Sequence, residues 1–191
     1  MGVHGLEQND KGYDSTASVE YLGADITYDL KENKSSDYTL TLARVRSLEP
    51  FSWQLPSMSW KLNFHFDKVC IECPNKEAAF YSEGGIGLNY AISTQFFIYT
   101  LINARLVTWQ NDQLHSVISP GYEIGSRLGL NNGNITISVE PYYYHSRWLN
   151  AVNAQGTYYF TTEQNLFLQF KENRYKSIKS DRALAGWQYF W

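Results

Sequence analysis

The chain has 191 residues, and 16 Lys and Arg stand against 19 Asp and Glu, which gives a net charge of -3 at pH 7. This length suits a single domain or one barrel of about ten strands, and the acidic balance without a basic run argues against a nucleic-acid partner. No stretch approaches the roughly 20 consecutive apolar residues of a transmembrane helix. Aromatic residues make up 16%, a share typical of membrane interfaces and also of carbohydrate-binding sandwiches.

After an N-terminal segment over residues 1–14, apolar and polar side chains alternate along ten segments. This period of two predicts strands with two different faces. The predicted strands cover residues 18–30, 37–48, 59–67, 79–92, 95–107, 119–130, 134–145, 151–160, 164–173 and 182–191. About ten residues suffice to cross a bilayer at the usual tilt, whereas soluble sandwiches use strands nearer five or six. We therefore expect an all-β fold over residues 1–191, an antiparallel up-and-down transmembrane β-barrel of about ten strands.

The alternation is clearest in SWKLNFHFD, residues 59–67, where Trp60, Leu62, Phe64 and Phe66 share one face. If the apolar faces meet lipid, polar residues collect inside, where a narrow barrel leaves room for side chains rather than a channel. Isolated buried charges are costly, so we expect a structural network of paired charges, with a narrow polar pore or a ligand pocket as alternatives. The predicted lumen residues are Asp25, Asp29, Lys61, His65, Asp67, Glu83, Asn103, Arg105, Glu123, Arg127 and Glu140.

The two cysteines, Cys70 and Cys73, form CIEC between the third and fourth predicted strands. A zinc site would need two further ligands, and a redox pair normally opens a helix, so a local disulfide is the favoured interpretation. We expect no metal and no cofactor.

The connections predict an orientation, because outer-membrane barrels have short periplasmic turns and longer outer loops. With Trp191 placed in the periplasm, the longer charged connections fall outside, namely 31–37, 69–78, 109–115, 145–150 and 173–181. The short ones fall inside, apart from LEPFSWQLPS, residues 48–57. This predicted periplasmic loop is either a folded cap on the barrel mouth or a surface on which Phe51 and Trp53 dock a partner.

The last predicted strand, RALAGWQYFW, carries Gly186, Tyr189 and Trp191. It is similar to the terminal signal that bacterial barrel-assembly machinery recognises, an alternating apolar strand that ends on an aromatic residue. The expected location is therefore the bacterial outer membrane, with its lipid and the assembly machinery as partners.

One weak catalytic candidate is present. His145 and Ser146 lie at an outer rim in YYYHSRW, but a nucleophilic site needs the imidazole to reach the hydroxyl and a third group to orient it. Adjacent strand residues point to opposite faces, so we expect no catalysis.

Several segments between residues 3 and 91 resemble a known family: VHGLEQNDKGY, VEYLGADITYDL, ARVRSLEPF followed by LPSMSWKLNF, and SEGGIGLNYA. They look like the C-terminal barrel-like part of largely uncharacterised Gram-negative envelope proteins that carry an Lnb-type N-terminal periplasmic domain. The resemblance implies an outer-membrane or periplasm-facing location, with hydrolase or acyltransferase-like activity in the other domain. It also implies strands before VHGLEQNDKGY, which leaves open whether the barrel lacks one or two N-terminal strands.

The expected function is thus an outer-membrane anchor or scaffold for a periplasmic domain or protein partner, without catalysis of its own. Three alternatives remain: a lipid-modifying enzyme, a narrow polar pore, and a soluble β-sandwich or lipocalin-like binding protein.

Overall fold

The computed structural model describes residues 17–29, 34–51, 58–68, 77–110, 113–144, 146–160, 164–175 and 178–189. They form ten strands, as predicted. The strands are β1 (Ala17–Asp29), β2 (Lys34–Ser47), β3 (Ser59–Asp67), β4 (Ala79–Ala91), β5 (Phe96–Gln110), β6 (Leu114–Leu130), β7 (Gly133–Tyr144), β8 (Arg147–Tyr159), β9 (Gln164–Tyr175) and β10 (Ile178–Tyr189). In the described ranges, no helix is long and apolar enough to cross a membrane.

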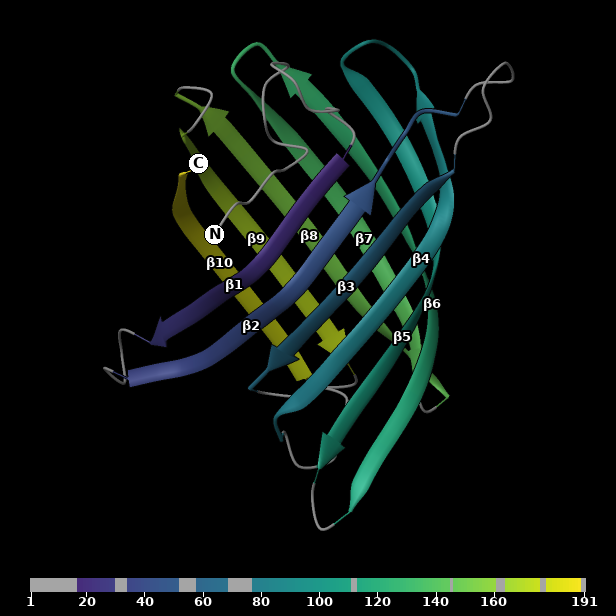
Figure 1. Cartoon of the computed structure of the whole chain (residues 1–191), viewed down its shortest axis with the longest axis vertical. Coiled ribbons are helices and arrows are strands. Elements are labelled where there is room, and N and C mark those ends of the chain that lie inside the picture. Colours follow the sequence, from purple (N-terminus) through teal and green to yellow (C-terminus); the bar gives the residue numbers. More distant parts are fainter. Residues whose placement is uncertain are drawn as a thin grey trace.

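The strands form one antiparallel sheet in chain order, β1 to β10, so the predicted all-β, up-and-down fold is confirmed. The sheet curls on itself: β1 to β5 form the front wall in Figure 1 and β6 to β10 lie behind them. Within the described residues, each strand pairs only with its chain neighbours, and the sheet is open between β1 and β10.

The predicted difference in loop length between the two ends is wrong. Three segments expected to be long outer loops, 109–115, 145–150 and 173–181, mostly belong to strands, because only residues 111–113, 145–146 and 176–177 separate the paired strands. Polar side chains at both faces of a strand end hide the period of two, while the backbone ladder continues. Loop length therefore does not orient the sheet.

A bulge in β2 decides which face its basic residues occupy. Thr41 pairs with His65, but Ala43 pairs with Phe64, so Leu42 is an extra residue between two ladder positions. An extra residue shifts all later side chains to the opposite face. Consequently Arg46 lies opposite Lys61, on the inner face, rather than with the outward Leu40.

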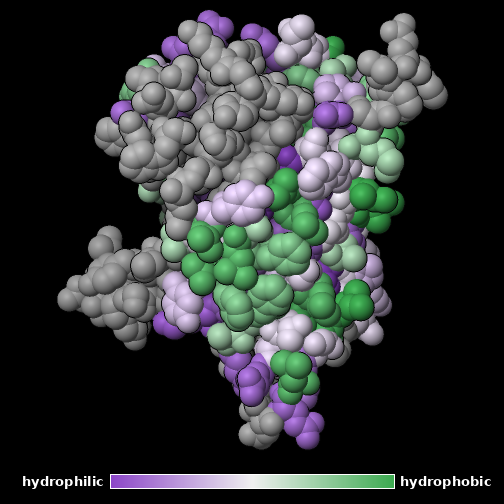
Figure 2. Space-filling model, in the orientation of Figure 1, coloured by the Kyte–Doolittle hydropathy of each residue, from purple (hydrophilic) through white to green (hydrophobic). Residues whose placement is uncertain are grey.

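The two faces of the sheet have inverted polarity relative to a soluble protein. The inner face buries polar and charged side chains, among them Lys61, Glu83, Asn103 and Glu123. The outer face exposes large apolar ones, such as Leu62, Ile86, Ile102, Ile124, Ile137 and Leu168. Figure 2 shows the apolar residues gathered across the middle of the front wall, with hydrophilic residues toward its projecting lower tip. A contiguous exposed apolar surface of this kind marks a site of interaction with a partner, a ligand or a membrane.

Of the three buried apolar clusters among the described residues, two lie on either side of the charged middle of the interior. Ala79, Tyr81, Val107 and Trp109 are buried together toward the β5–β6 hairpin. At the other end, Leu48, Tyr99 and Leu101 form the second buried cluster. The interior is thus layered, apolar at both ends and ionic between them.

Candidate functional site

The carboxylate of Glu123, on β6, is the centre of the ionic layer, and its side chain is fully buried. Arg46 donates two hydrogen bonds to it, of 2.6 and 2.8 Å to its two oxygens. Lys61 Nζ lies 2.7 Å from Glu123 Oε2, and the Tyr99 hydroxyl donates to Oε1 at 2.8 Å. Both of the Arg46 bonds come from Nη2, and hydrogen bonds between charged groups are among the stronger contacts in proteins, so Glu123 joins side chains from β2, β3 and β5 to β6.

Lys61 extends the layer to a second carboxylate, that of Glu83 on β4, with which it forms an ion pair. Glu83 also accepts from Arg105 Nη2 at 3.0 Å and from Arg105 Nε at 3.2 Å. The Arg105 guanidinium lies 3.8 Å from the centroid of the Tyr142 ring, a distance suited to cation–π attraction. The front wall and β7 are therefore linked across the interior.

The charges of this layer balance. Three cations, Arg46, Lys61 and Arg105, meet three carboxylates, because Glu140 also lies 3.7 Å from Lys61. Buried ions are tolerated when each is paired and hydrogen-bonded. Within these six described side chains each charge has an opposite partner, and the arrangement joins the strands that carry them.

Glycines make room for the large side chains of the layer. A Cβ at Gly125 would overlap the phenol of Tyr99, and one at Gly85 would overlap the amide of Asn103. Gly85 belongs to the SEGGIGLNYA segment, and a glycine inside a strand commonly marks a place where another group approaches the backbone closely.

The other predicted lumen residues lie around the layer. His65 stacks on Tyr81 with ring centroids 4.7 Å apart. Asp67 and Arg127 are half-buried. The side chains of Asp25 and Asp29 lie outside the described residues, although both positions belong to β1. The sequence interpretation missed Arg46, Tyr99 and Tyr142.

The segment after β2 lies beside the end of β4. Asn89 donates from Nδ2 to the carbonyl of Leu48, and Phe51 N donates to the Asn89 carbonyl at 2.7 Å. Pro50 forms a parallel bridge with Asn89. Residues 48–51 thus bond to the end of β4 at Asn89, while Trp53, the other predicted docking residue, lies outside the described part of the chain.

The remaining predicted site residues fall at or beyond the edges of the described chain. Cys70, Cys73, His145 and Trp191 lie outside it, as does the side chain of Tyr189, although Gly186 and Tyr189 both belong to β10. Ser146 lies in the two-residue β7–β8 connection with a φ of 62°, the left-handed conformation that tight hairpins favour. It is a turn residue, in agreement with its place in the predicted connection 145–150.

The chemistry open to this site is limited. Within the described ranges, no group of three or more His, Cys, Asp or Glu side chains is arranged to hold a metal ion. Among those residues, the ionic layer also places no Ser, Thr or Cys in the network with its carboxylates. The geometry is that of a set of ion pairs that join strands across the inner face of the curled sheet.

Comparisons with known proteins give one match. A family model described as a domain of unknown function, DUF7840, matches residues 1–190. The comparisons with curated proteins and with solved structures found no match. The likeness to Lnb-type proteins stays a prediction.

Proposed function

Because the chain belongs to the DUF7840 family, a domain of unknown function, we propose its role from its geometry: it is an outer-membrane β-barrel wall that anchors a periplasmic domain or partner. The observation that carries this proposal is the inverted polarity of the sheet, with a paired ionic layer inside and large apolar side chains outside. In a protein surrounded by water, the exposed apolar surface would destabilise the folded state, and so would the desolvation of the buried ions.

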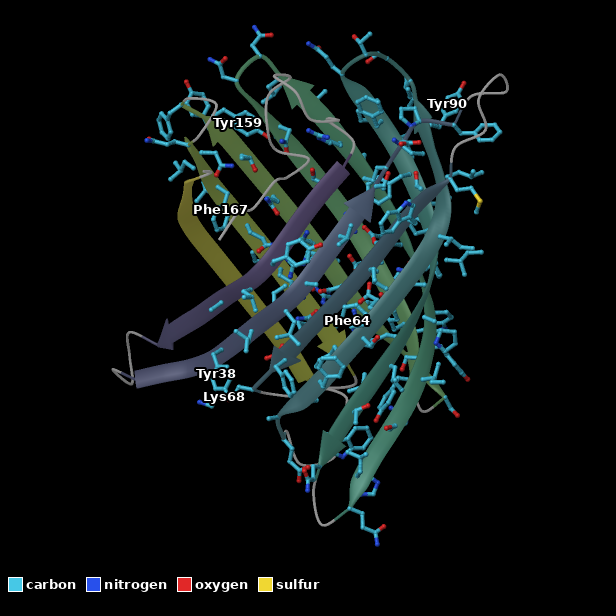
Figure 3. All side chains as sticks on the ribbon, viewed as in Figure 1. Tyr38, Phe64, Lys68, Tyr90, Tyr159 and Phe167 are labelled. Carbon is cyan, nitrogen blue, oxygen red and sulfur yellow. The ribbon has the colours of Figure 1, made fainter. Side chains whose placement is uncertain are left out.

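Aromatic side chains support a bilayer around the outer wall. Phe80 and Tyr90 stand at opposite ends of β4, ten residues apart, and so do Trp148 and Tyr158 on β8. Figure 3 shows Tyr90 at one end of the sheet and Tyr38 beside Lys68 at the other. Ten residues rise about 33 Å along a strand, which at a tilt near 40° gives about 25 Å along the membrane normal, the usual height of the apolar band between aromatic girdles.

The filled interior favours an anchor over a pore. The ionic layer joins β2 to β7 across the interior, and the apolar clusters around Trp109 and Leu101 lie on either side of it. A water-filled path needs polar space along its whole length. The rim segment 48–51, held by Asn89, supplies the surface at which a periplasmic partner would meet the barrel.

The purified chain tests the membrane assignment. We expect it to need detergent for solubility and to migrate on a gel at two positions, depending on whether the sample is heated, because folded barrels resist unfolding at room temperature. A chain that stays soluble and monomeric without detergent would contradict the proposal and favour the lipocalin-like alternative.

Planar bilayers test the anchor against the pore. Wild-type protein should insert without stepwise conductance, since its interior is closed by packed side chains. Insertion is verified in the same preparation by protease protection of reconstituted vesicles. Reproducible single-channel steps from inserted protein would overturn the anchor assignment while leaving the membrane assignment intact.

A further inference from the structure

The back wall has a defect where β6 meets β7. The ladder between these strands runs from Leu130 and Gly133 to Gly121 and Tyr142, omits positions 122 and 123, and ends there. In the register of this ladder Pro141 lies opposite position 122, and Pro120 immediately precedes Gly121 on β6. Proline lacks the N–H that a central strand donates, so it is rare inside sheets. Two prolines on neighbouring strands therefore mark a weakened seam.

Beyond this point β6 continues without β7. Residues 114–120 pair with β5 alone, while β7 turns back into β8 after Tyr144. Gly121 closes the seam from behind, because a Cβ there would overlap the carbonyl of Pro141 and the ring of Tyr142. The two strands therefore share few ladder pairs at this position, but their atoms still pack closely.

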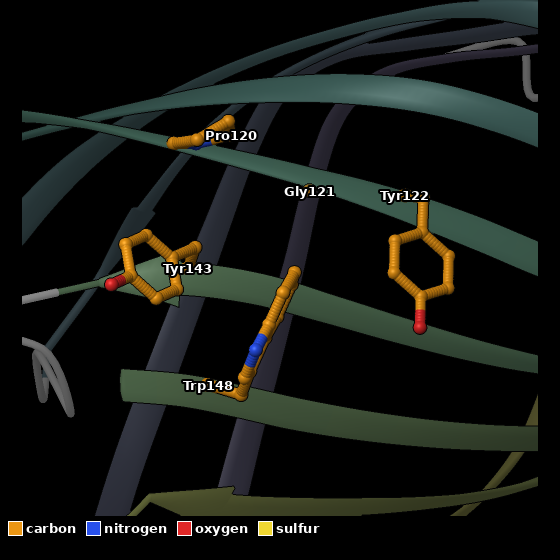
Figure 4. A pocket seen from close by; sticks show the side chains of 5 residues that line it. All are labelled: Pro120, Gly121, Tyr122, Tyr143 and Trp148. Carbon is orange, nitrogen blue, oxygen red and sulfur yellow. The ribbon is translucent and has the colours of Figure 1, made fainter. Parts of the chain in front are cut away.

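An open cavity of about 400 Å³ lies on the outer side of the seam, lined by Pro120, Gly121, Tyr122, Tyr143 and Trp148. The indole of Trp148 stands between the two tyrosines, as Figure 4 shows, and the Tyr143 hydroxyl points away from it. The ring centroids of Trp148 lie 5.4 Å from those of Tyr143 and 6.0 Å from those of Tyr122, both edge to face. These rings hold one another in place.

The chemistry of the lining selects the occupant. No residue that lines the cavity is charged, so an ionic headgroup or a charged peptide finds no counter-charge there. The rings and the proline present carbon surface, and the neighbouring outward side chains, Ile124 and Val139, are also apolar and exposed. Apolar cavities lined by aromatic side chains bind apolar ligands by desolvation.

We propose that this cavity is a fixed binding site for one alkyl chain of a membrane lipid. The inference rests on the proposed function in one respect, since the bilayer is what supplies the chain. The lipid fills the β6–β7 seam and remains bound when the loosely held lipids around the rest of the wall exchange. Recognition is by the chain, so headgroups that share the same chains bind alike.

Native mass spectrometry of the full chain tests the site. Protein in detergent micelles is titrated with palmitoyl-oleoyl phosphatidylethanolamine and, separately, with the phosphatidylglycerol of the same chains. Wild-type protein should retain one lipid at activation energies that strip the others, equally for both headgroups. Trp148→Ala should lower the retained fraction on the order of tenfold, because the central aromatic contact is lost.

Tyr158→Ala is the matched control, since Tyr158 is on the same strand and, like Trp148, is 50% exposed on the outer face. It should retain lipid as the wild type does, and so should Tyr143→Phe, which keeps the ring. If Trp148→Ala does not fold, Tyr122→Ala on β6 replaces it. Equal loss in Trp148→Ala and Tyr158→Ala, or retention of only one headgroup, overturns the site.

The two proposals fail separately. A detergent-dependent, heat-modifiable chain that retains no lipid loses the alkyl-chain site and keeps the membrane assignment. A detergent-free soluble chain that still binds the lipid in a Trp148-dependent way loses the membrane assignment and keeps the site.

Discussion

Replacing Glu123 by alanine should lower the free energy of unfolding by about 3–5 kcal/mol, the range found when one partner of a buried ion pair is removed. The substitution leaves the Arg46 guanidinium, the Lys61 ammonium and the Tyr99 hydroxyl without their shared acceptor. The positive charges of Arg46 and Lys61 would then face one another inside the sheet. Urea titration of the protein in phospholipid vesicles, followed by tryptophan fluorescence, measures the loss.

Two further variants separate the charge from the shape of Glu123. Glu123→Gln keeps the volume and an acceptor oxygen but no negative charge, so most of the loss should persist. Arg174→Ala breaks an ion pair with Glu172 in which the arginine side chain is 63% exposed, and exposed pairs contribute less than about 1 kcal/mol. A Glu123→Ala protein as stable as Arg174→Ala would show that the ionic layer does not hold the sheet together.

The strands were predictable because their alternation is nearly unbroken. In β3, residues 59–67, apolar side chains take alternate positions, and the predicted bounds are those observed. A period of two follows from the pleat itself, so it appears in the sequence wherever the two faces meet different surroundings. Here the inner face of the sheet carries a paired ionic layer and the outer face is apolar, so the two faces differ strongly.

The strand ends were not predictable for the same reason. At the β5–β6 hairpin the sequence reads WQNDQLH, with polar residues in successive positions. Gln110 nevertheless pairs with Leu114, and Trp109 with His115. The backbone ladder needs no apolar side chain, so the strands extend where the alternation ceases. Because the strands extend this far, the lengths of the connections do not indicate the orientation of the sheet.

Only part of the ionic layer was predictable from the sequence, because Arg46 and Tyr99 were not among the predicted lumen residues. Strict alternation from Leu40 would place Arg46 on the outer face, and the bulge at Leu42 moves it inside. A single extra residue carries no sequence signal of its own here. Tyr99 is not marked by the sequence because its row continues with the apolar Leu101, although a buried tyrosine normally seeks a partner for its hydroxyl.

The bulge in β2 and the prolines in β6 and β7 interrupt regular strand pairing with opposite effects. In β2 an inserted residue brings a cation into register with Glu123, which strengthens the middle of the wall. At the β6–β7 seam, Pro120 and Pro141 weaken the ladder beside the aromatic cavity. Both departures from regular pairing lie next to a site, as expected where local rules are broken for a purpose.

Replacing Ile102 by arginine should lower the free energy of unfolding in phospholipid vesicles by about 2–4 kcal/mol, the cost of a lipid-facing arginine near the bilayer midplane. Ile102 is 75% exposed on the outer face of β5 and pairs with Ile86, which lies between Phe80 and Tyr90 along β4. On a surface that meets water, the same change would alter stability by no more than about 0.5 kcal/mol.

Leu114→Arg is the matched control, because Leu114 is 72% exposed on the next strand but lies at the tip of the β5–β6 hairpin, the lowest point of the sheet in Figure 1. An arginine there would reach water, so its cost should fall to about 0–1 kcal/mol. The difference between the two variants, measured by urea titration in vesicles, reports the height of each position in the bilayer. Equal and small effects at both positions would mean that the apolar outer face does not meet lipid.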